Sequence, residues 1–436
     1  MKEKIKSILL ILLVLNSIVL TWILIYYSPN DGNATISEYL PRFRFGKESS
    51  MQEIVQIKQI ILHFGNNQHT IIYPESKAYP TFLQEIKKAS FYDIALHQQP
   101  VDWKTIIESQ KGIELILPGD LPQDVLSSIL MISSPPQVFD QVNRIWVTSG
   151  VDNTTVVYFL SDHDDKVYTA KTSLSMKNME TLLTPNQTLP QYSYLLSQSS
   201  AKKAIKKFYY LPEEELQIQI PRRTLVPISE DHLVQIFFLD PTGVRKVYDR
   251  KESQRMIYTD GSRSMQVYTG EHYLNYYQPV VNVQRNLDRV KDLKTGINYI
   301  NQHGGWEGNY YLTSLKTIGS RQWEFQFNQY MNGIPVREDD LMPHQVQINN
   351  GSVSFVQIPT MLLIESESAN HVSLKKRAVL MGELKKENIA STDIDSMELI
   401  FQMVQKREFV EFYPYWEIIL NNKKQVEIPA DQSGVL

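Results

Sequence analysis

The chain has 436 residues, no cysteine and a formal net charge of −4 at pH 7. The first seven residues contain three Lys and one Glu, so the remainder carries −6 and has little attraction for nucleic acids or anionic lipids. Without cysteine no disulfide can form, and the length suggests several domains whose cores depend on the burial of apolar side chains.

Residues 8–27 form an apolar segment without a single charged side chain. As a helix, such a segment reaches about 30 Å, which matches the hydrocarbon core of a bilayer. A secretory signal peptide has a shorter apolar core, of about 7–15 residues, followed by a small-residue cleavage site, which is missing here. We therefore predict one uncleaved transmembrane helix over 8–27.

Basic residues flank this helix on one side. Lys2, Lys4 and Lys6 precede it, and the next basic residue is Arg42. Because positively charged flanks stay in the cytoplasm, residues 1–7 should form a cytoplasmic basic tail. The sequence thus predicts a single-pass protein of the cell membrane, with its N-terminus in the cytoplasm and its C-terminal region outside the cell.

A linker and a first α+β domain are predicted to follow the helix. Residues 28–50 are polar and irregular, which is typical of a linker, and the domain is expected over 51–175. Segment 81–89 places apolar residues at i, i+4 and i+7, which predicts a helix. Three strand-like runs are bounded by turn residues, at 112–119, 144–150 and 154–162.

A middle α+β domain is predicted over 176–303. It contains an expected strand at 234–241 and a hairpin turn at Asp260-Gly261. Apolar residues then recur at spacings of three and four over 287–300, which predicts a helix that ends before Gly304.

The C-terminal α+β domain, 304–436, has the same kind of pattern. Asn-Gly pairs at 332–333 and 350–351 each separate two strand-like runs, a strong hairpin signal. A helix is expected at 393–405, whose apolar residues share one helical face, and the last two strands are expected to pair through Asn421-Asn422. The fold class is therefore α+β, with mixed antiparallel sheets and helices in about three extracytoplasmic domains.

The sequence contains no motif of a catalytic, cofactor or metal site. HExxH, GxGxxG, P-loop and GxSxG patterns are all missing. The acidic run 162–165 lacks the alternating ligands and the glycine of a calcium loop, so we interpret it as a polar loop after a strand. Asp260 and Ser262 are interpreted as parts of a hairpin turn rather than as a nucleophile site. We expect no catalytic residue, no cofactor and no metal, and hence not an enzyme.

Several stretches resemble a known family. FFLDPTGVRKV…MIYTDGSRSMQVY, within residues 237–268, resembles the YycH (WalH) regulatory proteins of Gram-positive bacteria. The segments NGIPVRE and VEFYPYWEIIL are similar to the C-terminal region that YycH shares with YycI. The layout of a basic tail, one membrane helix and a cysteine-free exterior is also similar, so the resemblance covers essentially the full chain.

That resemblance implies a role in signal transduction. It predicts a non-catalytic regulator of the WalK (YycG) sensor histidine kinase, within the WalK/WalR (YycG/YycF) two-component system that controls cell-wall metabolism. A YycI-like membrane protein is the expected second partner, and no cofactor is implied. Whether the chain restrains or supports the kinase does not follow from the resemblance.

The predicted membrane helix carries three polar side chains ahead of Trp22, namely Asn16, Ser17 and Thr21. Ser17 and Thr21 are four residues apart and share a face, and Asn16 lies about 100° around the helix from Ser17. In lipid, such groups form hydrogen bonds with neighbouring helices, or Ser and Thr bond to carbonyls of their own helix. We predict that these three residues contact the kinase.

Two other functions stay open at the level of sequence. The exterior could be a sensor module that binds a wall fragment or peptide, or a cell-wall hydrolase with an unrecognised pair of carboxylates.

Overall fold

The computed structural model describes residues 4, 6, 10, 12–17, 19, 43–135, 138–150, 154–162, 165–183, 189–197, 205, 207–248, 255–280, 287–365, 370–407 and 409–432. The chain divides into two units, Met1–Arg42 and Phe43–Leu436, each of which is described by itself. In the first unit, residues 12–17 are helical. No helix within the described residues is long and apolar enough to cross a membrane. Most of the predicted span 8–27 lies outside these residues, so the transmembrane helix stays a prediction.

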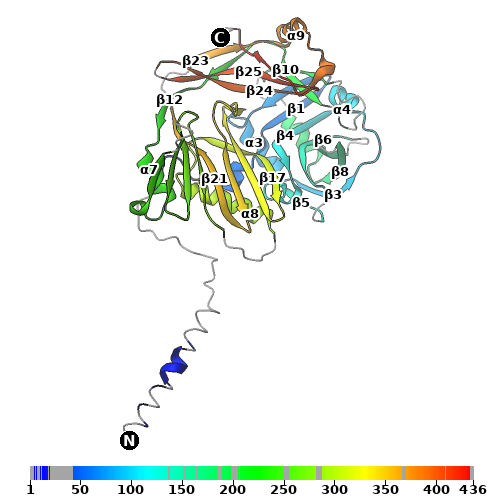
Figure 1. The fold of residues 1–436 in the computed structure, drawn as a ribbon. Coiled ribbons are helices and arrows are strands. Elements are labelled where there is room, and N and C mark those ends of the chain that lie inside the picture. Colours follow the sequence, from blue (N-terminus) through cyan, green and yellow to red (C-terminus); the bar gives the residue numbers. More distant parts are fainter. Residues whose placement is uncertain are drawn as a thin grey trace. The chain divides into compact units, whose positions relative to one another are not determined.

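The second unit is an α+β structure dominated by antiparallel pairing, as expected (Figure 1). Its described residues form sheets of ten, nine, five and two strands. The ten-stranded sheet has its strands in the order β10 (Phe208–Pro212), β9 (Tyr192–Leu196), β2 (Gln68–Ile72), β1 (Gln59–Gly65), β4 (Lys111–Leu121), β6 (Val142–Ser149), β7 (Thr155–Ser161), β8 (Lys166–Thr172), β3 (Ser90–Leu96) and β5 (Met131–Ser133).

Helices cover both faces of this ten-stranded sheet. Along β1, Ile60 and Leu62 belong to the main core, whereas Ile61 belongs to a second cluster with residues of α4. This alternation follows from the two-residue period of a strand. The helices of this part are α2 (Met51–Ile54), α3 (Tyr79–Lys88), α4 (Trp103–Ser109), α5 (Gln123–Leu126) and α6 (Met176–Leu183).

The nine-stranded sheet contains the predicted hairpins. Its order is β13 (Arg245–Tyr248), β14 (Arg255–Thr259), β15 (Ser264–Tyr268), β16 (Tyr273–Tyr277), β21 (Ser352–Pro359), β20 (His344–Asn349), β18 (Gln322–Met331) and β17 (Asn309–Gly319), with β19 (Ile334–Pro335) beside β18. Gly261, Gly333 and Gly351 all have positive φ in its turns, so these hairpin predictions are confirmed. Helix α8 (Arg289–Gln302) packs on this sheet, and Gly304 ends it with φ 107°.

The five-stranded sheet lies at the top of Figure 1. Its order is β22 (Met361–Glu365), β12 (Arg222–Pro227), β25 (Val410–Leu420) and β24 (Ile394–Gln405), and β26 (Gln425–Pro429) pairs with β25 through the predicted turn. The two-stranded sheet joins β11 (Leu216–Ile220) to β23 (Asn370–Leu374). The remaining helices are α7 (Glu230–Phe237), η4 (Pro241–Gly243), α9 (Arg377–Lys386) and η5 (Ser391–Asp393).

Two predicted elements are wrong. Segment 393–405 is not a helix, because β24 pairs with β25 along nearly its whole length. Its apolar residues Ile394, Met397 and Phe401 fit a helical spacing, yet Leu399 and Ile400 are buried as well, which one helical face would not require. Segment 234–241 is not a strand, because most of its apolar run belongs to α7.

The sheets connect segments that are far apart in the sequence. β9 and β10 join the first sheet although they follow residue 175, and β16 pairs with β21 across residue 303. The domain boundaries themselves stay a prediction.

Residues 43–50, the described part of the expected linker, pack against the end of α8 and the residues that follow it. Lys47 exchanges backbone hydrogen bonds with Trp306, and Ser49 N donates to Asn301 Oδ1 at 2.9 Å. A Cβ on Gly46 would lie 2.3 Å from the carbonyl carbon of Trp306, so only glycine allows this close approach. This segment is therefore built into the second unit.

Candidate functional site

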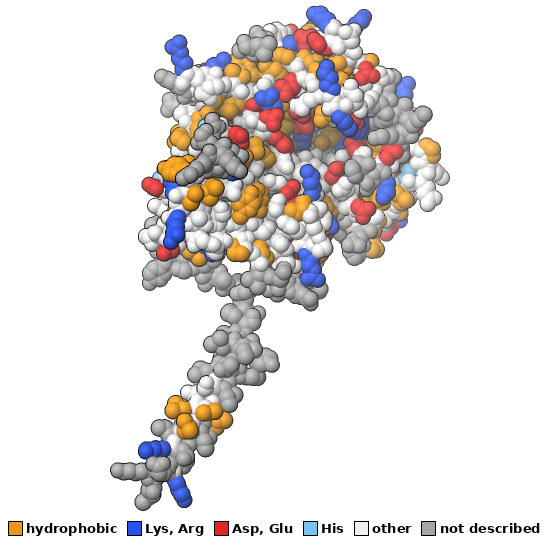
Figure 2. All heavy atoms as spheres, viewed as in Figure 1, with side chains coloured by type: hydrophobic (Ala, Val, Ile, Leu, Met, Phe, Trp, Pro, Cys, Tyr) orange, Lys and Arg blue, Asp and Glu red, His pale blue; other side chains and the backbone are white. Residues whose placement is uncertain are grey.

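A cavity of about 240 Å³ lies where the ten-stranded sheet meets the five-stranded sheet. Strands β1, β4, β6 and β10 form one wall, and β24 and β25 form the other. Figure 2 shows a hollow beneath the strands at the top of the view, with acidic and basic side chains around it. The aromatic lining includes Tyr73, Tyr209 and Trp416.

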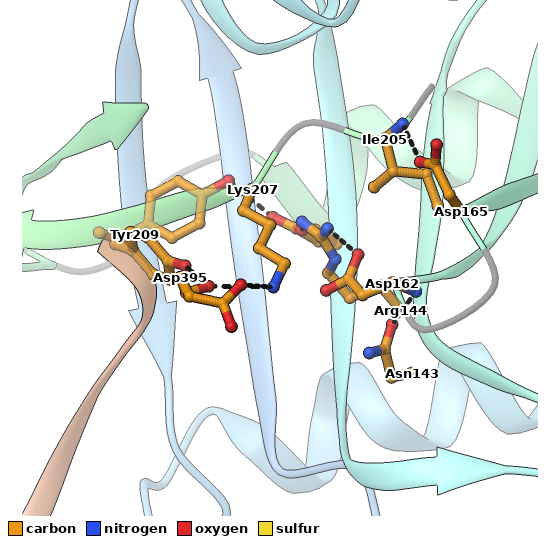
Figure 3. A network of polar contacts seen from close by, with 10 residues as sticks. Asn143, Arg144, Asp162, Asp165, Ile205, Lys207, Tyr209 and Asp395 are labelled. Atoms are coloured by element: carbon orange, nitrogen blue, oxygen red, sulfur yellow. Dashed lines mark hydrogen bonds and ion pairs between the residues drawn. The ribbon is translucent and has the colours of Figure 1, made fainter. Parts of the chain in front are cut away.

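Three ion pairs line this cavity. Arg144 Nη2 on β6 lies 2.6 Å from Asp162 Oδ1, just after β7 (Figure 3). Two further pairs join the sheets: Lys207 Nζ lies 3.2 Å from Asp395 Oδ1, and Lys58 contacts Glu398. Cations of the ten-stranded sheet thus meet carboxylates of β24 across the cavity.

Asp395 on β24 connects the two sheets where they meet, a boundary called the seam below. Its backbone carbonyl accepts a hydrogen bond from Lys207 Nζ at 2.9 Å and from the Tyr209 hydroxyl at 2.8 Å. Hydrogen bonds from Lys423 and Lys207 hold the pKa of the Asp395 carboxyl below its usual range, against the opposing effect of burial. This carboxylate therefore stays ionised.

A buried polar network lies behind the cavity wall. Glu114 on β4 accepts a hydrogen bond from the Tyr210 hydroxyl at 2.6 Å and lies 3.4 Å from Arg144 Nη1. Burial alone would lower the pKa of Arg144, but the charges of Asp162 and Glu114 outweigh it, so its pKa is raised. Burial, followed by the charge of Glu114, raises the pKa of Tyr210. Arg144 is therefore a permanent cation shared by two carboxylates.

Two histidines extend this network away from the cavity. The Nδ1 atoms of His63 and His69 lie 2.9 Å apart, so one ring donates and the other accepts a single proton. Both rings are buried, and His63 stacks on Trp146. Burial, followed by the charge of His63, lowers the pKa of His69 to about 3. The buried surroundings of the pair therefore favour the neutral form of His69.

The carboxylates of the cavity all have a basic partner. Each of the three cavity carboxylates is engaged by a cation, whereas a general acid needs a carboxyl held protonated. Among the described residues no group of three potential metal ligands occurs. In the acidic run 162–165, Asp162 pairs with Arg144 and Asp165 accepts from the Ile205 amide, whereas residues 163 and 164 lie outside the described part.

Of the residues predicted as a partner site, the described ones do not line this cavity. Asn16 and Ser17 lie in the helical stretch of the first unit and are exposed there, and Thr21 lies outside the described residues. Whether they form one face that contacts the kinase stays a prediction.

Sequence reasoning missed Glu114, Arg144 and His63. For Glu114 and His63 the signal was present, because each places an ionisable side chain inside an apolar strand-like run, whereas Arg144 stands at the start of its run, directly after Asn143. A buried charge needs a partner, so such positions indicate a network even where the partners are unknown.

Two family models match the chain: "YycH protein, N-terminal domain" over residues 3–187 and "YycH protein, C-terminal domain" over residues 206–432. Together they cover most of its length. This chain belongs to the YycH family. The resemblance to the YycH family is thereby confirmed.

Individual relatives agree with this assignment. Over 452 aligned residues the chain is 22% identical to the Bacillus subtilis "Two-component system WalR/WalK regulatory protein YycH", covering 97% of this chain and 95% of that protein. The crystal structure of YycH from Bacillus subtilis matches with a TM-score of 0.66 at 15% identity, over 89% of this chain and 99% of that one. This YycH-family chain therefore has the same fold. An uncharacterised Eubacterium rectale protein matches 48% of this chain and 82% of its own at 11% identity, with a TM-score of 0.31, too low to carry an argument.

Proposed function

We propose that this YycH-family chain is a membrane-anchored, non-catalytic regulator of a WalK-type sensor histidine kinase. The observation that carries the proposal is the match along nearly the whole length of a relative named as a regulator of the WalR/WalK system. The chain would act in the same two-component system, which controls cell-wall metabolism, together with a YycI-like membrane protein.

The anchor in this proposal is the apolar segment 8–27. The N-terminal family model begins at residue 3, so this segment belongs to the matched region. Residues 1–7 would lie in the cytoplasm and the second unit outside the cell. Contact with the kinase would run through Asn16, Ser17 and Thr21, and each interhelical hydrogen bond contributes about 0.6–2 kcal/mol.

A non-catalytic role is supported by the chemistry of the cavity. A glycoside hydrolase needs one carboxyl with a raised pKa and a second carboxylate at a defined separation. Here the cavity carboxylates are paired with Lys58, Arg144 and Lys207. Purified chain incubated with cell wall should therefore release no soluble fragments, and release that is lost in an Asp162→Asn variant would favour a hydrolase.

Pull-down from membranes tests the anchor and the partner together. The full chain should retain the kinase, whereas a chain lacking residues 1–30 should lose it while keeping its cooperative thermal transition. Retention of the kinase by the truncated chain would place the contact on the exterior instead.

A further inference from the structure

The cavity between the two sheets has a mixed lining, in which apolar side chains lie beside three ion pairs. Its volume is about 240 Å³. That is below the usual range for drug-sized ligands, about 300–1,000 Å³. A ligand held wholly within the cavity would therefore be the size of an amino acid or a very short peptide.

The cavity lining carries equal numbers of positive and negative side chains. Three cations face three carboxylates: Lys58, Arg144, Lys207, Asp162, Asp395 and Glu398. A cation that engaged Asp395 would leave Lys207 half-buried without a counter-charge, and an anion that engaged Lys58 would do the same to Glu398, which is unfavourable; Asp395 has a second cation beside it, Lys423 at 2.8 Å. A zwitterion avoids this cost, because its carboxylate can meet a lysine while its ammonium meets the carboxylate opposite.

An unused hydrogen-bond donor gives a second, independent observation. Trp416 on β25 lines the cavity and is 6% exposed, and its Nε1 has no hydrogen-bond partner within the described part of the chain. A buried indole N–H without a partner is costly, so an acceptor is expected beside it. The carboxylate of a bound ligand would supply that acceptor.

We propose that this cavity binds a small zwitterion, a free amino acid or a dipeptide, through Lys207, Asp395 and Trp416. The ligand would contact both sheets at once, because Lys207 precedes β10 whereas Asp395 and Trp416 lie on β24 and β25. This inference goes beyond kinase regulation, and its test measures binding to the purified chain alone.

Isothermal titration of the full chain in detergent micelles tests the site. The probes are D-alanine, L-alanine and glycyl-glycine, which separate a free amino acid from a dipeptide. Acetate, methylammonium and N-acetylglycinamide serve as controls that carry one charge or none. At least one zwitterion should bind saturably with a stoichiometry of one, and at least tenfold more tightly than each control.

A double variant locates the binding. Lys207→Gln with Asp395→Asn removes one charge pair across the seam and should weaken binding at least tenfold. The matched control, Lys171→Gln with Asp93→Asn, removes an exposed pair of similar geometry, 2.9 Å apart, and should leave binding unchanged. Should the first variant fail to fold, Trp416→Phe keeps an aromatic side chain but removes the N–H, and should weaken binding severalfold.

Three results would overturn the proposal. The first is the absence of saturable binding by every zwitterion at millimolar concentration. The second is acetate or methylammonium binding as tightly as the zwitterions. The third is wild-type affinity in the folded cavity variants, which would place the bound ligand elsewhere on the protein.

Discussion

Lowering the pH should destabilise this protein through its buried pair of histidines. Burial and the neighbouring His63 lower the pKa of His69 to about 3, whereas an unfolded histidine titrates near 6.5. Between these values the unfolded chain binds a proton that the folded chain excludes. The free energy of unfolding therefore falls as the pH falls, and between pH 7.5 and pH 5 this single group accounts for a loss of about 2 kcal/mol.

Urea unfolding of residues 43–436, which form one compact unit, measures this effect. His69→Gln removes the titrating group, so the wild type should lose about 2 kcal/mol more than the variant over that pH range. His371→Gln is the control, because His371 is exposed on β23 whereas His69 is buried. Equal losses in the wild type and His69→Gln would refute the reasoning, since acid sensitivity would then come from other groups.

Three further outcomes are expected. Mass spectrometry of membrane-extracted protein should find the N-terminus intact, because segment 8–27 is long for a signal peptide and lacks a cleavage site, and a chain beginning near residue 28 would contradict this. Residues 31–436 should keep one cooperative thermal transition after EDTA treatment, because the sequence has no cysteine and the described residues contain no group of three potential metal ligands. Loss of the transition would indicate a structural metal. Phe401→Ala should cost about 3–5 kcal/mol of unfolding free energy, because this ring is fully buried on β24. Gln405→Ala, at an exposed position of the same strand, is the control and should cost less than about 0.5 kcal/mol. Similar losses in the two variants would contradict the burial of Phe401.

Elements with strong local signals could be predicted from the sequence. Helix α8 has both an amphipathic spacing and a glycine end, and the hairpins at Gly333 and Gly351 need a backbone conformation that glycine adopts readily. These signals act between neighbouring residues, so distant parts of the chain do not change them.

Elements that depend on contacts with other parts of the chain are harder to predict from the sequence. In β24, the spacing of Ile394, Met397 and Phe401 suits a helix, but pairing with β25 and burial on both sides select the strand. For α7 a local signal was overlooked: Ser229 caps the helix by accepting from the His232 amide, and Leu233, Ile236 and Phe237 are buried at helical spacing.

The cavity could not be predicted from the sequence, for a different reason. Lys58 and Glu398 are 340 residues apart in the sequence, and no local pattern indicates that they meet. What the sequence does show is that Glu114 lies inside an apolar run, which predicts a buried partner without identifying it.

The central claim is that the membrane helix connects this chain to the kinase. A triple variant, Asn16→Leu with Ser17→Leu and Thr21→Leu, keeps segment 8–27 apolar and able to span, but removes its polar side chains. Transcription of a WalR-dependent gene, measured in cells that carry the variant at normal levels, should shift toward the value in a deletion strain. Transcription at the wild-type level would contradict the account and assign the regulatory contact to the exterior.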